Sequence, residues 1–208
     1  MVTAMCWLGA ANTTWGAILW NNPITGPNPG ADNPYTTGQT FDADLTVSGI
    51  GRGAGINAAG TTANRYNATS WNTASIDTTA YFTFTLTPNS GKQINFTSFV
   101  YTGQASATGP TSFAFRSSLD FTLDIGTPTA TGTTISLSDA AYQNISSAIE
   151  FRLYGWGASD STGTFSVNDF TFNGSVVPEP TTWAMIAFGA LFGTVQLVRL
   201  CRRHLTAG

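Results

Sequence analysis

The side chains that most often perform catalysis are scarce in this chain and lie near its ends. The single histidine is His204, and the two cysteines, Cys6 and Cys201, are separated by almost the whole sequence. A Ser-His-Asp or Cys-His arrangement therefore lacks its base throughout the central part of the chain. A zinc site built from histidine or cysteine is excluded there on the same ground. We expect no structural disulfide between cysteines so placed.

Carboxylates are the remaining candidates for chemistry. Glu150 with one of the nine aspartates before residue 177 could supply the carboxylate pair of a glycosidase, but no short acidic motif in an apolar setting indicates one. Asp42 with Asp44, and Asp120 with Asp124, could be partial calcium ligands, because hard cations prefer oxygen donors. The favoured interpretation is that these aspartates are solvated and form turns. We therefore predict no enzyme, no metal site and no cofactor.

Charge is low and unevenly distributed along the chain. Only 9% of the residues are charged, and residues 1–177 carry five basic and ten acidic side chains. We expect no nucleic-acid partner, because phosphates require basic patches. The hydrophobic content of 42% and aromatic content of 12% are ample for a packed core, so low charge does not indicate disorder here.

The C-terminal segment has three parts, which are the motif Val177-Pro178-Glu179-Pro180, the apolar run from Trp183 to Val198, and the basic cluster Arg199, Arg202 and Arg203. With the two preceding threonines, the apolar run just reaches the roughly 17 to 20 residues that a membrane-spanning helix needs. Arginines hold their end of a span in the cytoplasm, so we expect the larger N-terminal part outside. The two prolines prevent a helix and leave an extended peptide, which suits a processing enzyme.

This three-part order, over residues 177–206, resembles the PEP-CTERM sorting signal. The resemblance implies that Val177 to Pro180 is the recognition motif, that 183–198 is the span, and that the arginines are the membrane stop. It also implies a partner, an exosortase, which is a membrane-embedded cysteine protease or transpeptidase of Gram-negative bacteria that make exopolysaccharide. The alternative is an ordinary single-span anchor in which Pro-Glu-Pro occurs by chance.

The sequence thus predicts five segments. Residues 1–16 are apolar and contain the small-residue run Gly9-Ala10-Ala11, so they are predicted to be the remnant of a longer signal peptide. The others are a β-sandwich ectodomain at 17–175, a linker with the sorting motif at 176–182, a transmembrane helix at 183–198 and a basic cytoplasmic tail at 199–208. We expect an exported protein that lies in the inner membrane before processing and at the cell surface or outside the cell afterwards.

Alternating patterns predict that the ectodomain is all β. In Tyr81–Thr87, apolar residues alternate with threonines. In Ile149–Trp156, the apolar residues Ile149, Phe151 and Leu153 alternate with Glu150, Arg152, Tyr154 and Trp156. Further strands are predicted at 17–20, 45–50, 93–101, 112–116, 121–124, 133–137 and 164–172. About nine short strands indicate two packed antiparallel sheets, a jelly roll or related sandwich. A phase change at Asn168-Asp169 predicts a bulge, and one helical turn is predicted within 139–144.

The ectodomain also resembles a recurrent family of exported bacterial proteins that carry this sorting signal. The matching pieces extend over most of residues 17–175 and are Gly51–Gly55, Tyr81–Pro88, Thr108–Ser118, Phe151–Trp156 and Gly163–Asp169. The resemblance implies a jelly-roll-like sandwich of unknown biochemical activity.

Three classes of function remain open. The first is a surface or matrix protein associated with exopolysaccharide. The second is a carbohydrate-binding module, in which Tyr154 and Trp156, with Arg152 on the same strand, would form the glycan site. A neighbouring strand or loop could instead cover the aromatic pair, and Arg116 and Arg152 could form ion pairs with Asp120 or Glu150. The third is ice binding through the threonine ladder Thr83, Thr85 and Thr87, although threonine is also a common strand former.

Overall fold

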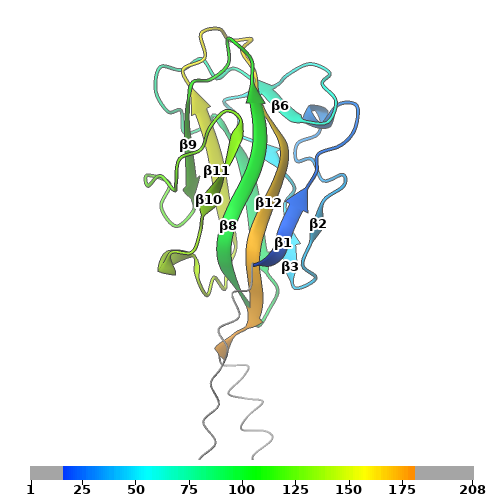
Figure 1. Cartoon of the computed structure of the whole chain (residues 1–208), viewed down its shortest axis with the longest axis vertical. Helices are drawn as coiled ribbons and strands as arrows, with labels where there is room; N and C mark the ends of the chain where they lie inside the picture. Colours follow the sequence, from blue (N-terminus) through cyan, green and yellow to red (C-terminus); the bar gives the residue numbers. More distant parts are fainter. Residues whose placement is uncertain (1–15, 181–208) are drawn as a thin grey trace, which may run out of the picture.

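The computed structural model describes residues 16–180, which form two antiparallel β-sheets packed face to face (Figure 1). The predicted all-β sandwich is thus present. Among residues 16–180 there is no helix with the length and apolar character needed to cross a membrane. The predicted span at 183–198 lies outside the described residues.

The larger sheet has seven strands, and its central path runs in the order β10, β8, β12, β1, β2. β6 pairs with the N-terminal end of β12, and β5 pairs with β6. The strands are β1 (Ala17–Asn22), β2 (Thr40–Phe41), β5 (Asn57–Ala58), β6 (Tyr66–Thr69), β8 (Lys92–Ala105), β10 (Gly132–Ser136) and β12 (Phe165–Pro178).

The smaller sheet has five strands, four of them in the order β3, β7, β11, β9, with β4 also paired to β7. The strands are β3 (Leu45–Val47), β4 (Gly51–Arg52), β7 (Tyr81–Pro88), β9 (Ser112–Ser117) and β11 (Ile149–Trp156). From β7 to β12 each successive strand lies in the other sheet, so every connection in this half of the chain crosses the sandwich.

Aromatic side chains fill the space between the sheets. Phe172 on β12 is fully buried and lies at the centre of a group of rings. Its ring centroid is 4.5 Å from that of Phe99, 5.2 Å from that of Phe151 and 5.8 Å from those of both Trp20 and Phe84. Because these rings come from both sheets, the ring cluster joins the two layers. Aromatic pairs at these separations stabilise a core beyond the area that they bury.

Two local predictions are confirmed. The pairing of β12 with β8 shifts register between Val167 and Asp169, where the bulge was predicted, so Phe165 and Phe170 are both buried despite their opposite parity. The predicted helical turn is the 3₁₀ helix Ala140–Tyr142, whose N-cap Asp139 accepts a hydrogen bond from the backbone N–H of Ala141. A second 3₁₀ helix, Pro29–Ala31, was not predicted.

Other expectations about the strands were wrong. Residues 121–124, predicted as a strand, form turns in the connection between β9 and β10. Within residues 16–180 there are twelve strands rather than about nine, and β8 and β12 are fourteen residues long rather than short. Four strands were missed. β2, β4 and β5 have only two residues each, too few for a periodic pattern to appear, and β6 has only four.

The ring cluster makes Phe172 a position where truncation is damaging. We expect Phe172→Ala to lower the free energy of unfolding by about 3 to 5 kcal/mol, because it removes buried contacts and leaves a cavity. Urea denaturation monitored by circular dichroism measures this. Phe41→Ala is the matched control, since Phe41 on β2 is 45% exposed and its loss should change stability by about 0.5 kcal/mol or less. Equal effects of the two substitutions would contradict the central role of Phe172.

Candidate functional site

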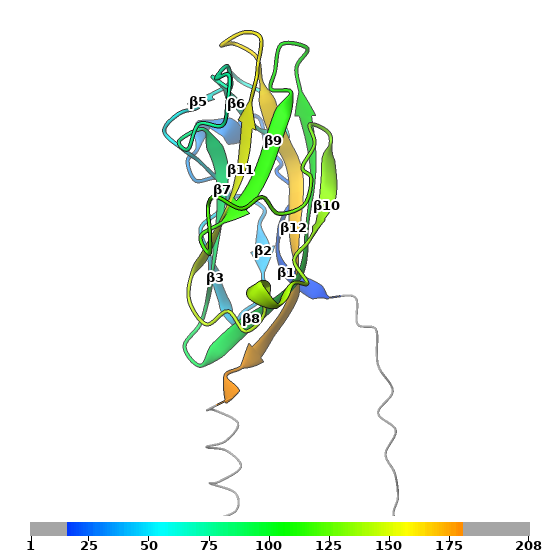
Figure 2. The same ribbon diagram turned by 90° about the vertical axis from the view of Figure 1, so that its left-hand side faces the viewer.

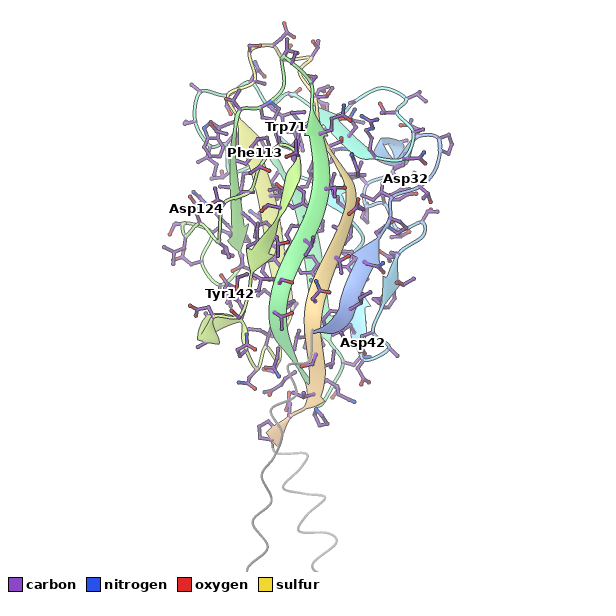
Figure 3. The ribbon with its side chains drawn as sticks, viewed as in Figure 1. Asp32, Asp42, Trp71, Phe113, Asp124 and Tyr142 are labelled. Carbon is purple, nitrogen blue, oxygen red and sulfur yellow. The ribbon has the colours of Figure 1, made fainter. Side chains whose placement is uncertain are left out.

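One side of the sandwich has two hollows. It lies between β9 and β10, which are the edge strands of the two sheets, and the connection 118–131 crosses it (Figure 2). This connection is attached to β9 by the backbone N–H of Ile125, which donates to the carbonyl of Phe115 at 2.8 Å. Figure 3 shows Phe113 near the upper end of this side, and Asp124 and Tyr142 lower down.

The upper hollow, which we call the Trp156 cleft, has a volume of about 770 Å³. It is formed by the end of β8, the turn that follows it, the start of β9, the end of β11 and the segment 127–130. Its lining consists of small, hydroxylated, proline and aromatic residues, namely Ala105, Ser106, Ala107, Gly109, Pro110, Thr111, Ser112, Phe113, Thr127, Pro128, Thr129, Ala130 and Trp156. None of these side chains is charged.

Backbone hydrogen bonds hold the turn beside the cleft. The N–H of Ser106 donates to the carbonyl of Thr164 at 3.0 Å, and the N–H of Thr164 donates back to the Ser106 hydroxyl at 2.9 Å. The N–H of Ser159 donates to the carbonyl of Thr108 at 3.1 Å. The β8–β9 and β11–β12 turns approach so closely that a Cβ on Gly109 would lie 2.3 Å from the Thr164 carbonyl oxygen. The cleft is therefore built on turns that brace one another.

Tyr101 on β8 holds the opposite wall. Its hydroxyl donates to the carbonyl of Thr129 at 2.6 Å and accepts from the N–H of Thr129 at 2.9 Å. The Thr129 hydroxyl in turn donates to the carbonyl of Gly132 at 2.7 Å. Burial raises the pKa of Tyr101 to about 12 from its ordinary 10.0, because the ionised phenol would lose its hydration. The neutral phenol thus fixes segment 127–130.

The structure separates the two aromatic residues predicted to bind glycan. Trp156 is half-buried, lies opposite Ser112 in the pairing of β11 with β9, and lines the cleft. Tyr154 is only 1% exposed. Tyr81 packs on its ring at a centroid distance of 5.4 Å, and the Arg116 guanidinium lies 5.6 Å from its centroid. The alternative, in which neighbouring residues cover the aromatic pair, therefore holds for Tyr154 and not for Trp156.

Arg152, the third predicted glycan-binding residue, is held by neighbouring side chains. Its Nε donates to the Glu150 carboxylate at 2.7 Å. Its guanidinium lies 3.9 Å from the ring centroid of Phe121 and 4.2 Å from that of Tyr81. Arg152 thus joins β11 to the connection 118–131 through its cation–π contact with Phe121 and to β7 through that with Tyr81. The predicted ion pair with Glu150 is confirmed.

Arg116 lies directly opposite Arg152 in the sheet, where two like charges would repel. An ion pair offsets this repulsion: Arg116 Nε lies 2.6 Å from the Asp124 carboxylate. The predicted partner was Asp120. Its guanidinium also donates to the carbonyl of Phe121 at 2.9 Å. Each arginine therefore has a separate acidic partner.

The aspartates considered as calcium ligands have partners within the chain. Asp44 forms an ion pair with Lys92 at 2.7 Å, and Asp42 accepts the N–H of Asp44 at 2.9 Å. Asp120 accepts both the hydroxyl and the N–H of Thr122, and these bonds lower the pKa of Asp120. Asp42 and Asp120 thus form local turns, as interpreted, whereas Asp44 and Asp124 form ion pairs. No group of three acidic, histidine or cysteine side chains within residues 16–180 could hold a metal ion.

The lower hollow, of about 550 Å³, contains two of the aspartates, Asp124 and Asp139, and the ring of Tyr142. Asp124 pairs with Arg116, and Asp139 caps the 3₁₀ helix. Both carboxylates thus stabilise local structure, and the lower hollow offers no pair of unengaged acids.

The threonine ladder on β7 stops at β11. Thr85 lies opposite Glu150 and Thr83 opposite Arg152, and the Thr83 hydroxyl donates to Glu150 at 2.9 Å. On the other side, Thr87 lies opposite Thr46 of β3. A flat, repeated threonine surface therefore does not extend across this sheet.

The predicted sorting motif begins inside β12. Val177 pairs with Gln93 and Pro178 with Lys92, so the predicted domain boundary after residue 175 falls within the strand. The ladder ends at Pro178, which has no N–H to donate. Glu179 is half-buried, and its N–H donates to the carbonyl of Gly91 at 2.9 Å. The predicted membrane stop, Arg199, Arg202 and Arg203, lies outside the described residues.

In comparisons with known proteins, no family model, no curated protein and no solved structure matches this chain.

Sequence reasoning identified Trp156 but not the rest of the cleft. The cleft residues of 106–111 and 127–130 lie in turns, which carry no alternating pattern. The local signals there, Gly109-Pro110 and Pro128, indicate turns but not that the two turns meet.

The ionisation of Tyr101 predicts a loss of stability in alkali. Because its pKa is raised in the folded state, its contribution is complete below about pH 10 and is lost as the pH rises toward 12. Between pH 9 and 11 we expect Tyr101 to account for a loss of about 1 kcal/mol in the free energy of unfolding. Urea titrations at several pH values measure this loss.

Tyr101→Phe tests the assignment. The variant should be less stable at pH 7 by about 1 to 3 kcal/mol, because the amide and carbonyl of Thr129 lose their partner. Its further loss between pH 9 and 11 should be smaller than that of the wild type, since phenylalanine does not ionise. An unchanged alkaline loss in Tyr101→Phe would contradict this role.

Proposed function

We propose that this protein is an exported surface or matrix protein, sorted by an exosortase and associated with exopolysaccharide. The observation that supports this most directly is the position of the motif. β12 leads to Val177-Pro178-Glu179-Pro180 at the end of the sandwich where β1 also begins (Figure 1). Its first two residues, Val177 and Pro178, continue the extended backbone of β12, which is the backbone form that a processing enzyme binds.

The sandwich would be oriented by this attachment. β12 runs from Phe165, whose ring centroid lies 4.8 Å from that of the cleft residue Phe113, to Pro178 at the other end of the strand. At about 3.3 Å per residue, fourteen residues separate the two ends by roughly 45 Å. With the motif at the membrane, the cleft would face away from the cell, toward the surrounding matrix.

The proposed role is non-enzymatic, and we assign the sandwich to the jelly-roll type. The alternation of β7 to β12 between the two sheets supports the jelly-roll assignment. The hydroxyls of the Trp156 cleft have no histidine or carboxylate beside them in its lining, so nothing there would activate a nucleophile. Such a site can bind a ligand but has no group suited to acid–base chemistry.

Carbohydrate binding is the second candidate function. It is favoured by Trp156, which is half-buried in a hollow rich in hydroxyl groups. Sugar sites commonly combine an aromatic surface with a few placed polar groups. The two candidate functions are compatible, because one concerns delivery of the protein and the other what it holds.

Replacing Pro178, Glu179 and Pro180 by alanine tests the sorting proposal. In an exopolysaccharide-producing Gram-negative host with an exosortase, we expect the wild type to be converted to a shorter form that leaves the inner membrane. The triple variant should keep its full mass and stay in the membrane fraction. Mass spectrometry of the fractionated cells measures both forms.

Two controls make this test specific. Ser175→Ala, an exposed change two residues before the motif, should be processed like the wild type. In a host lacking the exosortase, the wild type should accumulate at full mass. Processing that persists without the exosortase, or in the triple variant, would overturn the sorting proposal. A wild type that keeps its full mass in the host with the exosortase would indicate an ordinary anchor with a chance Pro-Glu-Pro.

A further inference from the structure

We propose that the Trp156 cleft binds a neutral polysaccharide chain and discriminates against acidic ones. This inference rests on the second candidate function and adds to it the chemical class of the ligand and the residues that contact it. The first support is electrostatic. The lining contains hydroxyls, prolines, small residues and two aromatic rings, but no lysine, arginine, aspartate or glutamate.

An acidic sugar would be penalised in such a cleft. A carboxylate loses its hydration when it enters the cleft, and the lining offers no cation that would compensate for this loss. A neutral sugar ring brings hydroxyls, which exchange one hydrogen bond for another at little net loss. The absence of charge in the lining therefore favours neutral sugars over uronic acids.

Trp156 provides the stacking surface. Residues 16–180 contain three tryptophans, and Trp20 and Trp71 are fully buried in the core. Trp156 alone among them is partly open to solvent. The indole combines a large apolar face with one N–H donor, so it can contact the C–H face of a sugar ring and bond a hydroxyl. Its backbone carbonyl accepts the N–H of Thr111 at 3.1 Å, which fixes the strand end that carries it.

The hydroxyls of the cleft divide into structural and available groups. The Ser106 and Thr129 side chains hydrogen-bond to the backbone of Thr164 and Gly132. The Thr111 hydroxyl donates to the carbonyl of Gly157 at 3.4 Å, whereas Ser112 and Thr127 also line the cleft and are half-buried and exposed, respectively. Ser112 is also the cross-strand neighbour of Trp156. Ser112 therefore places a donor and acceptor directly beside the stacking surface.

The binding surface is already organised in the free protein. The turns on one wall are joined by backbone hydrogen bonds, and Tyr101 fixes segment 127–130 on the other. Ligand binding therefore orders few protein groups, and less of the interaction free energy is lost to entropy.

The test is isothermal titration calorimetry on the full chain, solubilised in a detergent without a sugar headgroup. The probes are cellohexaose, maltohexaose and mannohexaose as neutral chains, and the hexamers of galacturonate and mannuronate as acidic ones. We expect at least one neutral hexamer to bind at least tenfold more tightly than either acidic hexamer. Its Kd should be the same at 50 and 500 mM NaCl, because no ion pair forms.

Variants locate the binding site. Trp156→Ala should weaken binding of the neutral hexamer at least tenfold, whereas Trp156→Phe, which keeps a ring, should weaken it less. Phe41→Ala, which removes another partly exposed ring from a distant strand, should leave the Kd unchanged. Circular dichroism confirms that each variant is folded.

Each outcome has a distinct meaning. Binding of the acidic hexamers as tight as that of the neutral ones, lost in Trp156→Ala, would overturn the neutral class but retain carbohydrate binding. No binding of any hexamer at 10 mM would overturn both the neutral ligand class and carbohydrate binding by the cleft. The sorting proposal would be unaffected, because it has its own test. Binding that survives Trp156→Ala would overturn the assignment of the cleft.

Discussion

The register between β8 and β12 is the constraint on which the rest of the sandwich depends. These two strands pair along almost their entire lengths and form the middle of the larger sheet. A slip of one residue would turn every inward side chain of β12 toward solvent. The bulge between Val167 and Asp169 and the shift between Asn173 and Gly174 set this register at two points. The first of them lies between Phe165 and Phe172, so these two residues, which differ in parity, reach the same core.

This pairing also connects the two regions to which we assign functions. At one end, β8 and β12 lead into the mutually braced turns that support the Trp156 cleft. At the other end, the same two strands hold Val177 and Pro178 beside Gln93 and Lys92. The aromatic core centred on Phe172 lies between them and joins the two sheets. One pair of strands thus fixes the position of both the cleft and the motif.

The sequence was sufficient to predict the features that depend on a long periodic pattern. The alternation in β7 and β11 predicted which side chains enter the core, and the phase change predicted the bulge in β12. Features that depend on meetings between distant segments could not be predicted. Tyr154 has the parity of an outward residue, but Arg116 and Tyr81 from the neighbouring strands cover it. Phe121 belongs to an alternating segment, but it packs on Arg152 from a turn instead of joining a sheet.

The direction in which β12 leaves the sandwich has a mechanical consequence. A pull on Pro178, opposed by a load held at the Trp156 cleft, acts along the axis of β12. The hydrogen bonds to β8 and β1 lie across that axis, so they bear the force side by side instead of breaking one after another. The domain is therefore arranged to resist stretching between these two points better than peeling from either edge.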